Sequence, residues 1–210
     1  MRHPDPSIQN IIFDLGGVII NLAPQKTVEA FARLSGLPPE TVLKAYSERP
    51  EFHLYEKGLL TNREFRSALR TLFNMEASDA ELDACWNAML LDIPLQRIQL
   101  LEKLKKNYRV FLLSNTNDIH LQCFNQIAHG VTGQPGLEPW FHKAYYSHQM
   151  KMRKPDVEIY EHVLAENKLL PAATLFLDDN LSNLEGARQA GIQTFHVQHP
   201  DLIFTLFHES

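Results

Sequence analysis

Cysteine and long apolar runs are both scarce in this sequence, and their scarcity disfavours several classes of protein. The chain has two cysteines, Cys85 and Cys123, which form neither a CxxC pair nor a metal-ligand spacing. This argues against a disulfide scaffold and favours a reducing compartment. No stretch reaches the ~18 apolar residues of a membrane-spanning helix, and residues 1–6 lack the apolar core of a signal peptide. We therefore expect a cytoplasmic protein with no membrane partner.

The sequence also lacks an excess of basic residues. It has 20 Lys plus Arg against 25 Asp plus Glu, a formal net charge of −5. Non-specific nucleic-acid binding needs a basic face, so we expect no nucleic-acid partner. Internal repeats and low-complexity segments are absent as well. What is present is a globular composition, 44% hydrophobic and 21% charged over 210 residues, long enough for one domain with a sizeable insertion.

The first apolar segment predicts a buried strand followed by a long helical insertion. Residues 11–13 are apolar and stop at Asp14, and such an unalternating run is typical of a strand in a parallel sheet. A second run of this kind covers residues 18–20. From 24 to 91 apolar residues recur at helical spacing, and Thr61 and Ser78 each begin a predicted capping box. We expect this block to be entirely helical.

Helices and strands alternate after this block. Strands are expected at 108–113, 143–146, 174–177 and 192–197, and helices at 94–106, 155–167 and 181–190, with a further helix before a Gly- and Pro-rich loop at 130–138. The alternation predicts an α/β fold, a doubly wound (Rossmann-like) parallel sheet core with an α-helical cap inserted after the first strand. We expect a core domain of residues 1–22 and 92–210 and a helical cap domain of residues 23–91.

Polar residues follow three of the expected strands, and they indicate the chemistry. Asp14 follows the first strand, Ser114-Asn115 the second and Asp178-Asp179 a later one. Because ligands bind beyond the carboxyl ends of strands in open parallel sheets, these side chains should meet at one edge, where Lys154 can add a cation. Clustered carboxylates need a cation between them, and oxygen ligands favour Mg²⁺ with substrate phosphate oxygens. The residues therefore predict Mg²⁺-dependent phosphoryl chemistry with a carboxylate nucleophile.

At these residues the sequence resembles the haloacid-dehalogenase-like hydrolases. Four motifs of that superfamily match in order: 11–18 (IIFDLGGV), 111–117 (FLLSNTN), 153–156 (RKPD) and 175–187 (LFLDDNLSNLEGA). The helical block resembles the family's cap, and residues 56–61 (EKGLLT) match a recurring cap segment. Within the superfamily the sequence looks most like the branch that holds α-glucose-1-phosphatase and the phosphatase domain of soluble epoxide hydrolase. The resemblance implies a Mg²⁺-dependent phosphatase that hydrolyses a small phosphorylated metabolite through an aspartyl-phosphate.

The resemblance also implies a role for each matching residue. Asp14 is expected as the nucleophile and as a Mg²⁺ ligand, with the carbonyl of Gly16 and the carboxylate of Asp179 as further ligands. Asp178 is expected to support the metal site. The phosphoryl oxygens are expected to contact three side chains, those of Ser114, Asn115 and Lys154. Taken singly, the residues after the strands are equally well explained as turn and helix-capping residues.

Two positions depart from the family's pattern. Most phosphatases of the family have a general acid and base, an aspartate, where this chain has Gly16. Because such catalysis is typically worth ~10²–10⁴ in rate, we expect either an activated leaving group, such as that of a sugar 1-phosphate, or an acid recruited from elsewhere. Lys151 stands where the family commonly has glycine, and it adds positive charge to the lysine loop. Candidates for a recruited acid are His53 and Glu56 in the cap, and Asp118 and His120 after the second motif.

Other functions share parts of this pattern. A phosphotransferase or mutase would pass the aspartyl-phosphate to a sugar hydroxyl, although such relatives usually keep the aspartate that is missing at Gly16. A dehalogenase would not need the metal that Asp178 and Asp179 imply. A non-catalytic phosphate sensor, such as a response-regulator receiver, carries its acidic pair at the first strand and lacks a cap. The residues that select the substrate are expected in the cap, with His53 and Glu56 as candidates, and the sequence favours no particular oligomeric state.

Overall fold

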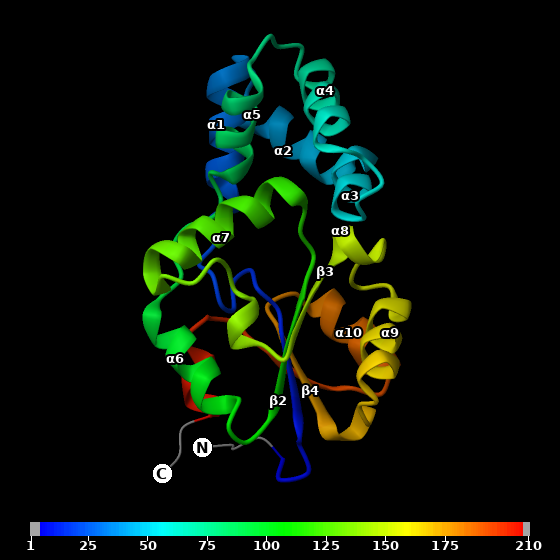
Figure 1. Cartoon of the computed structure of the whole chain (residues 1–210). Helices are drawn as coiled ribbons and strands as arrows, with labels where there is room; N and C mark the ends of the chain where they lie inside the picture. The colour runs from blue at the N-terminus through cyan, green and yellow to red at the C-terminus, as the bar shows by residue number, and fades with distance from the viewer. Residues whose placement is uncertain (1–4, 208–210) are drawn as a thin grey trace.

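The computed structural model describes residues 5–207 and contains a parallel sheet (Figure 1). Its five strands lie in the order β3-β2-β1-β4-β5. Their bounds are β1 (Asn10–Phe13), β2 (Arg109–Ser114), β3 (Lys143–Tyr146), β4 (Thr174–Asp178) and β5 (Gln193–His196). The central strand, β1, pairs with β2 on one side and β4 on the other, so that Ile12 lies level with Phe111 and Phe176. This arrangement confirms the predicted α/β fold.

Alternate residues of the strands face two separate apolar layers. Ile11 and Phe13 pack on one face of the sheet, which is covered by α6 (Leu95–Leu104), α7 (Asp118–Thr132) and α11 (Leu202–Leu206). Ile12 packs on the other face, which is covered by α9 (Val157–Asn167) and α10 (Leu181–Gln189). Because both faces are covered, every residue of β1 is buried, and its sequence is apolar without alternation.

Five helices follow β1 and form a separate layer at the top of the molecule in Figure 1. We call these helices the cap, and their bounds are α1 (Pro24–Ser35), α2 (Pro39–Glu48), α3 (Pro50–Glu56), α4 (Asn62–Leu72) and α5 (Asp79–Asn87). They share a core of their own, which includes Phe31, Phe52, Phe65 and Trp86. The capping boxes predicted at the starts of α4 and α5 are both formed. The helical block is therefore confirmed, whereas the domain boundaries at residues 23 and 91 remain predictions, and residues 1–4 and 208–210 of the predicted core lie outside the described chain.

Two linkers that lie side by side join the cap to the core. The first follows β1 and the second leads into α6. The amide of Asn21 donates to the carbonyl of Asp92 (2.9 Å), and the amide of Leu91 donates back to the carbonyl of Asn21 (3.0 Å). Leu22 and Leu90 form an antiparallel bridge beside them. This pairing fixes where the cap starts and ends relative to the sheet.

Several local features differ from the sequence prediction. The apolar run at 18–20 is a turn and not a strand, because its amides donate to the carbonyl of Leu15. The loop expected from Gly130 begins later, since α7 continues to Thr132 and ends at Gly133 in the left-handed conformation (φ 73°). A short helix, α8 (Ser147–Met150), follows β3 directly. Short 3-10 helices, η1 (Glu138–Trp140) and η2 (Pro171–Ala173), precede β3 and β4.

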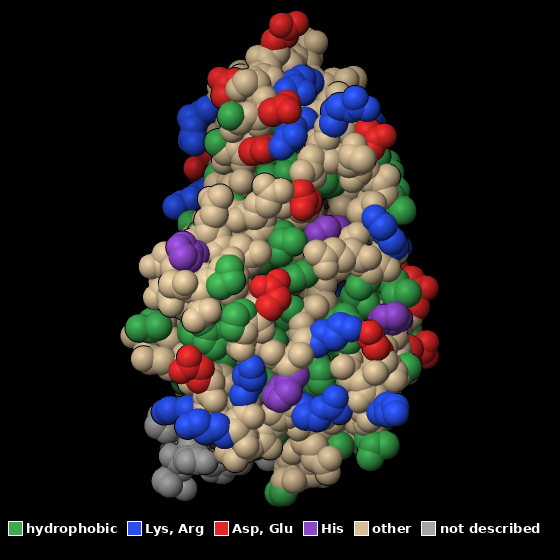
Figure 2. Space-filling model, viewed as in Figure 1, with side chains coloured by type: hydrophobic (Ala, Val, Ile, Leu, Met, Phe, Trp, Pro, Cys, Tyr) green, Lys and Arg blue, Asp and Glu red, His purple; other side chains and the backbone are tan. Residues whose placement is uncertain are grey.

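The described part of the chain has no helix long and apolar enough to cross a membrane. On the face shown in Figure 2, basic and acidic side chains intermingle over the cap. An example is Arg66, which pairs with Asp79 (3.3 Å) and Asp83 (2.7 Å) between α4 and α5. Because exposed ion pairs contribute little, the apolar core of the cap carries most of its stability.

Candidate active site

Three carboxylates meet at the carboxyl edge of the sheet. Asp14 follows β1, Asp178 ends β4, and Asp179 follows it. One oxygen from each lies within 4.8 Å of the others, although the strands that carry them are far apart in the sequence. Asp178 is fully buried and Asp14 is only 8% exposed. The strand pairing of β1 with β4 therefore produces the acidic cluster that the sequence predicted.

Lys154 places a buried positive charge inside this cluster. Its Nζ donates to Oδ1 of Asp14 (2.8 Å) and to Oδ2 of Asp178 (2.7 Å), and the residue is only 1% exposed. Burial works to lower the pKa of Lys154, but the two carboxylates outweigh it and raise that pKa above its usual value. Lys154 therefore stays charged, and it joins the loop before α9 to the ends of β1 and β4.

The residues that follow β2 hold the lysine loop in place. The side-chain amide of Asn115 donates to the carbonyl of Lys154 (2.9 Å), and its oxygen accepts from the amide of Lys154 (2.9 Å). Ser114, at the end of β2, is 3% exposed, and its hydroxyl lies 3.5 Å from the carbonyl of Asn115. The structure thus brings Asn115 against the backbone of Lys154, with Ser114 as its neighbour in the chain. Their contact with phosphoryl oxygens stays a prediction, and the contacts of Asn115 indicate that it positions Lys154.

Asp178 is held by the first turn of α10. Its Oδ1 accepts from the amide of Asn180 (2.8 Å), and the side-chain amide of Asn183 lies 3.1 and 3.0 Å from its two oxygens. A carboxylate at a helix start is also favoured by the helix dipole. Asn183 is a buried residue that the sequence analysis did not single out. The position of these donors fits the supporting role expected for Asp178.

The charges of the cluster fit a bound Mg²⁺. Burial raises the pKa of Asp14 to about 7. The positive charge of Lys154 opposes this rise, and the negative charge of Asp178 adds to it. Burial and the charge of Asp178 also raise the pKa of Asp179. A divalent cation between Asp14 and Asp179 would favour the charged form of both carboxylates. Gly16, whose carbonyl is the other expected ligand, follows Asp14 by two residues. All three expected ligands would therefore bind the ion through oxygen, as Mg²⁺ prefers.

Gly17 allows this turn to lie close to the acidic pair, and sequence reasoning missed its role. Its φ is +67°, in the region that favours glycine. A Cβ atom there would lie 2.5 Å from Oδ2 of Asp179. A larger residue would therefore displace the Asp179 carboxylate. The glycine doublet that follows Asp14 and Leu15 was the sequence signal that could have shown it.

The structure shows what surrounds each proposed recruited acid. His120 is buried, its Nε2 lies 3.0 Å from the carbonyl of Trp86, and burial lowers its pKa to about 4, which argues against a proton donor at this position. Asp118 accepts hydrogen bonds from side chains of the cap and of α7. Glu56 forms an ion pair with Arg153 (2.9 Å). His53 is exposed on α3, and the roles of His53 and Glu56 in substrate binding stay predictions.

A second set of contacts joins the cap to the core over α7, α8 and the lysine loop, where Figure 1 shows α5 above α7 and α3 above α8. We call this set the cap–core contact. Trp86 Nε1 donates to Oδ1 of Asn117 (3.2 Å), and the amide of Ile119 donates to the hydroxyl of Tyr55 (3.3 Å). The Glu56–Arg153 pair also belongs to it, as do two further bonds, Asn62 to Asp118 (2.6 Å) and Ser147 to the carbonyl of Glu56 (2.7 Å). Lys151, predicted to add charge to the loop, donates to the carbonyl of Gly58 in the cap.

Residues 8–191 match the haloacid dehalogenase-like hydrolase family. Together with the parallel sheet and the acidic cluster at its carboxyl edge, this match shows that the chain belongs to that family of enzymes. The family resemblance found in the motifs is thereby confirmed, whereas the branch within the family stays a prediction.

Relatives of the chain cover nearly its whole length. It is 32% identical over 192 residues to D-ribitol-5-phosphate phosphatase of Bacteroides thetaiotaomicron, which is 91% of this chain and 93% of the relative. A solved enzyme of the family from the same organism is similar with a TM-score of 0.89 at 37% identity, over 96% of this chain and 99% of that one. An alanine variant of that enzyme, with a TM-score of 0.89 at 35% identity over 96% and 100% of the two chains, is a complex with magnesium and inorganic phosphate.

Proposed function

We propose that the protein is a Mg²⁺-dependent phosphatase that hydrolyses a small phosphorylated sugar or polyol through an aspartyl-phosphate. One observation carries this proposal: the carboxylates of Asp14, Asp178 and Asp179 lie within 4.8 Å of one another beside the buried Lys154. The similarity to a phosphatase named for D-ribitol 5-phosphate supports the same reaction and substrate class. The magnesium and phosphate in a solved relative support the same cofactor.

In the proposed reaction a carboxylate oxygen of Asp14 attacks phosphorus, the bond from phosphorus to the leaving oxygen breaks, and that oxygen takes up a proton. Lys154 and the hydroxyl of Ser114 donate to the phosphoryl oxygens. A Mg²⁺ ion held by Asp14, Asp179 and the carbonyl of Gly16 would supply positive charge against the phosphoryl oxygens. Water then attacks phosphorus, releases inorganic phosphate and restores the Asp14 carboxylate.

The leaving group is the feature of the substrate that Gly16 affects most. Gly16 has no side chain to protonate the leaving oxygen, which favours a sugar 1-phosphate, an acyl phosphate or an aryl phosphate. The name of the ribitol 5-phosphate relative favours a primary alcohol as the leaving group. Relative rates on the two kinds of ester decide between an activated leaving group and an acid recruited from elsewhere in the site.

Steady-state phosphate release tests the proposal. Substrates are an aryl phosphate, sugar 1-phosphates and pentitol 5-phosphates, each with Mg²⁺ and with a chelator. We expect Asp14→Asn to lower kcat on the order of 10³-fold or more, because it removes the nucleophile. Glu161→Gln, an equivalent change at an exposed position of α9, should leave kcat unchanged. Release that continues in the chelator or in Asp14→Asn would contradict the proposal.

A phosphotransferase or mutase is the second candidate, because Gly16 offers no side chain to activate water, although relatives of that kind usually keep an aspartate at this position. Such an enzyme would transfer phosphate from the aspartyl-phosphate to a sugar hydroxyl without releasing inorganic phosphate. Labelled substrate separates the functions: label in inorganic phosphate indicates a phosphatase, and label in a second sugar ester indicates a transferase. Label that stays on Asp14 would indicate a phosphate sensor.

A further inference from the structure

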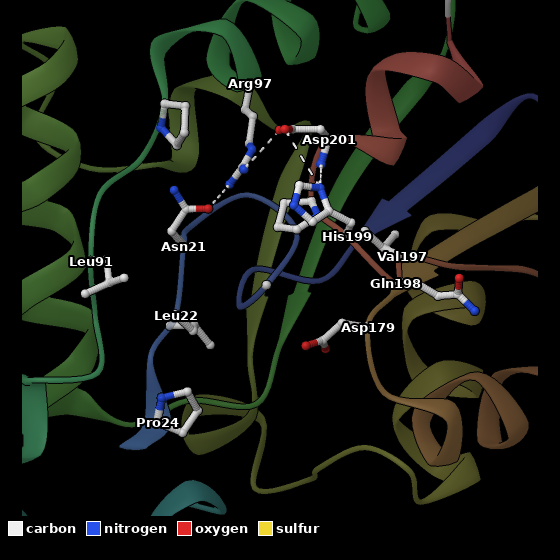
Figure 3. Close-up of a pocket in the computed structure, with 13 residues that line it drawn as sticks. Asn21, Leu22, Pro24, Leu91, Arg97, Asp179, Val197, Gln198, His199 and Asp201 are labelled. Atoms are coloured by element: carbon white, nitrogen blue, oxygen red, sulfur yellow. Dashed lines mark hydrogen bonds and ion pairs between the residues drawn. The ribbon is translucent and has the colours of Figure 1, made fainter. Parts of the chain in front are cut away.

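A cleft with both polar and apolar walls opens beside the acidic cluster, between the linkers and the segment that follows β5 (Figure 3). Its volume is about 640 Å³, within the ~300–1,000 Å³ typical of small-molecule sites. The carboxylate of Asp179 points into it from one wall, and Leu22 lies across from it in Figure 3. Because Asp179 belongs to the acidic cluster, the cleft reaches the proposed site at this residue.

On the side of the linkers, the cap leaves open space next to the core. Over α7, α8 and the lysine loop, the cap–core contact joins the cap to the core through buried or half-buried bonds such as Trp86 to Asn117 and Glu56 to Arg153. On the other side, the two linkers lie apart from the segment that follows β5, and the cleft lies between them. The free space for the organic part of a phosphate ester therefore lies on the side of the linkers.

Arg97, the one arginine or lysine among the described residues that line the cleft, is already paired. Arg97, which is 3% exposed, donates to the carbonyl of Ile19 (3.2 Å) and to Oδ1 of Asn21 (2.9 Å), and it lies 3.5 Å from Oδ1 of Asp201. These contacts fix Arg97 as a support for the first linker and leave little of its charge for a ligand. A second phosphate or a carboxylate on the substrate would thus find no unshared cation among the residues that line this cleft.

Two polar side chains at the edge of the cleft can bind hydroxyls. Gln198 and His199 follow β5, and both side chains are exposed at its edge. Nδ1 of His199 accepts from the amide of Asp201 (3.4 Å), which leaves Nε2 for another partner. Amide and imidazole groups suit hydroxyls as donor or acceptor, and the aliphatic walls suit the carbon chain.

We propose that this cleft holds the neutral polyhydroxylated carbon chain of the substrate, with Gln198 and His199 as the residues that recognise its hydroxyls. The inference rests on the proposed phosphatase function and names the part of the site that selects the substrate. The sequence predicted that the cap selects the substrate, and the inference adds the core segment after β5 to this role.

An apolar cavity in the cap offers a different location for the organic group. It measures about 180 Å³ and is lined by Val28, Leu43, Tyr46 and Met89, among others. It includes none of the acidic cluster, and its walls have almost no group that could bind a hydroxyl. A substrate with an alkyl chain would use this cavity, so comparing an alkyl phosphate with a polyol phosphate separates the two locations.

Titration calorimetry tests the inference without turnover. The background is Asp14→Asn with Mg²⁺ present, and the ligands are a pentitol 5-phosphate, n-pentyl phosphate and inorganic phosphate. We expect Gln198→Ala with His199→Ala to raise Kd for the pentitol ester about tenfold, since each lost hydrogen bond weakens binding severalfold. Kd for n-pentyl phosphate and for inorganic phosphate should not change. The matched control pairs Gln189→Ala with His162→Ala, at exposed positions of α10 and α9.

Other results would overturn the inference. An unchanged Kd of the double variant for the pentitol ester, or an equal rise for both esters, would show that Gln198 and His199 do not bind the hydroxyls. Tighter binding of n-pentyl phosphate than of the pentitol ester would place the organic group in the apolar cavity. Failure of the phosphatase function is recognised separately, because the active protein would then show no Asp14-dependent phosphate release while the calorimetry still reports on the cleft.

Discussion

At the scale of single residues, Lys154 has the largest structural effect. It is fully buried between two carboxylates, and each of the three groups is stable only because the others are present. Lys154 therefore serves folding as well as the proposed chemistry. The two contributions can be separated because folding is measurable without substrate.

We predict that Lys154→Met lowers the free energy of unfolding by about 3–5 kcal/mol in Mg²⁺-free buffer, because Asp14 and Asp178 would then be buried without a partner. Adding Asp178→Asn should recover part of this loss. Urea denaturation measures both effects, with Lys44→Met at an exposed position of α2 as the control. Equal stability of Lys154→Met and the parent protein would contradict the ion-pair network.

His120 gives the protein a pH-dependent stability. The folded state holds the imidazole neutral down to a pKa of about 4, whereas the unfolded chain takes up the proton near 6.5. The unfolded state thus binds more protons below pH 6.5, and stability falls as the pH is lowered from 6.5 to 4. We expect this group to contribute a loss of about 2 kcal/mol at pH 5 relative to pH 7.5.

Urea midpoints at the two pH values check this prediction. His120→Gln keeps a donor for the carbonyl of Trp86 but cannot titrate, so its stability should depend less on pH than that of the parent. His162→Gln, an exposed change on α9, should keep the parent's pH dependence. Identical pH dependence in His120→Gln and the parent would show that His120 is not held neutral.

At the scale of elements, the cap–core contact determines which parts of the cap move with the core. The Glu56–Arg153 pair is partly buried, at 19% and 20% side-chain exposure, and it lies between α3 and the lysine loop. Partly exposed pairs of this kind contribute up to about 1 kcal/mol. Its loss should loosen α3 and α8 locally and leave the rest of the cap intact.

We predict that Glu56→Gln speeds amide hydrogen exchange in α3 and α8 about two- to fivefold, which corresponds to this energy. Exchange in α1 and α5 should not change. Glu48→Gln, at the exposed end of α2, is the control. Faster exchange over the whole cap would indicate that the cap unfolds as one unit.

The sequence predicted the long elements well because their patterns are local. Buried strands, capping boxes and the helical block depend on neighbouring residues, and the structure confirms them. The turn at 18–20 was wrongly predicted as a strand, because its apolar residues are buried against the sheet without pairing with a strand of it. α8 was missed because four residues are too few to show a helical period.

The candidate site was predictable only in part, for a physical reason. Asp14 and Asp178 converge because parallel strands end at one edge, which follows from the fold class alone. The pairing of Glu56 with Arg153 depends on how the cap sits on the core. The cleft that Gln198 and His199 share with Asp179 depends on how the segment after β5 sits there. No local pattern in the sequence encodes that placement.

At the scale of the whole molecule, the acidic cluster links metal binding to folding. A cation that binds the folded chain stabilises it by about 2.7 kcal/mol at a hundred times Kd. For a chain of this size we expect saturating Mg²⁺ to raise Tm by roughly 5–10 °C. Asp179→Asn should remove most of this rise, whereas Glu185→Gln, at an exposed position of α10, should keep it. Thermal unfolding with Mg²⁺ and with a chelator gives the answer, and a Tm independent of Mg²⁺ would contradict the metal site.

The paired linkers have a consequence for how such a chain can evolve. The cap leaves and rejoins the core where Asn21 and Leu91 are hydrogen bonded to each other, so its two ends are neighbours in space. A segment whose ends meet can be lengthened, shortened or replaced by another without moving the strands around it. Descendants of one ancestor could thus exchange this segment and acquire new substrates, while Asp14, Lys154 and the acidic pair stay where the sheet holds them.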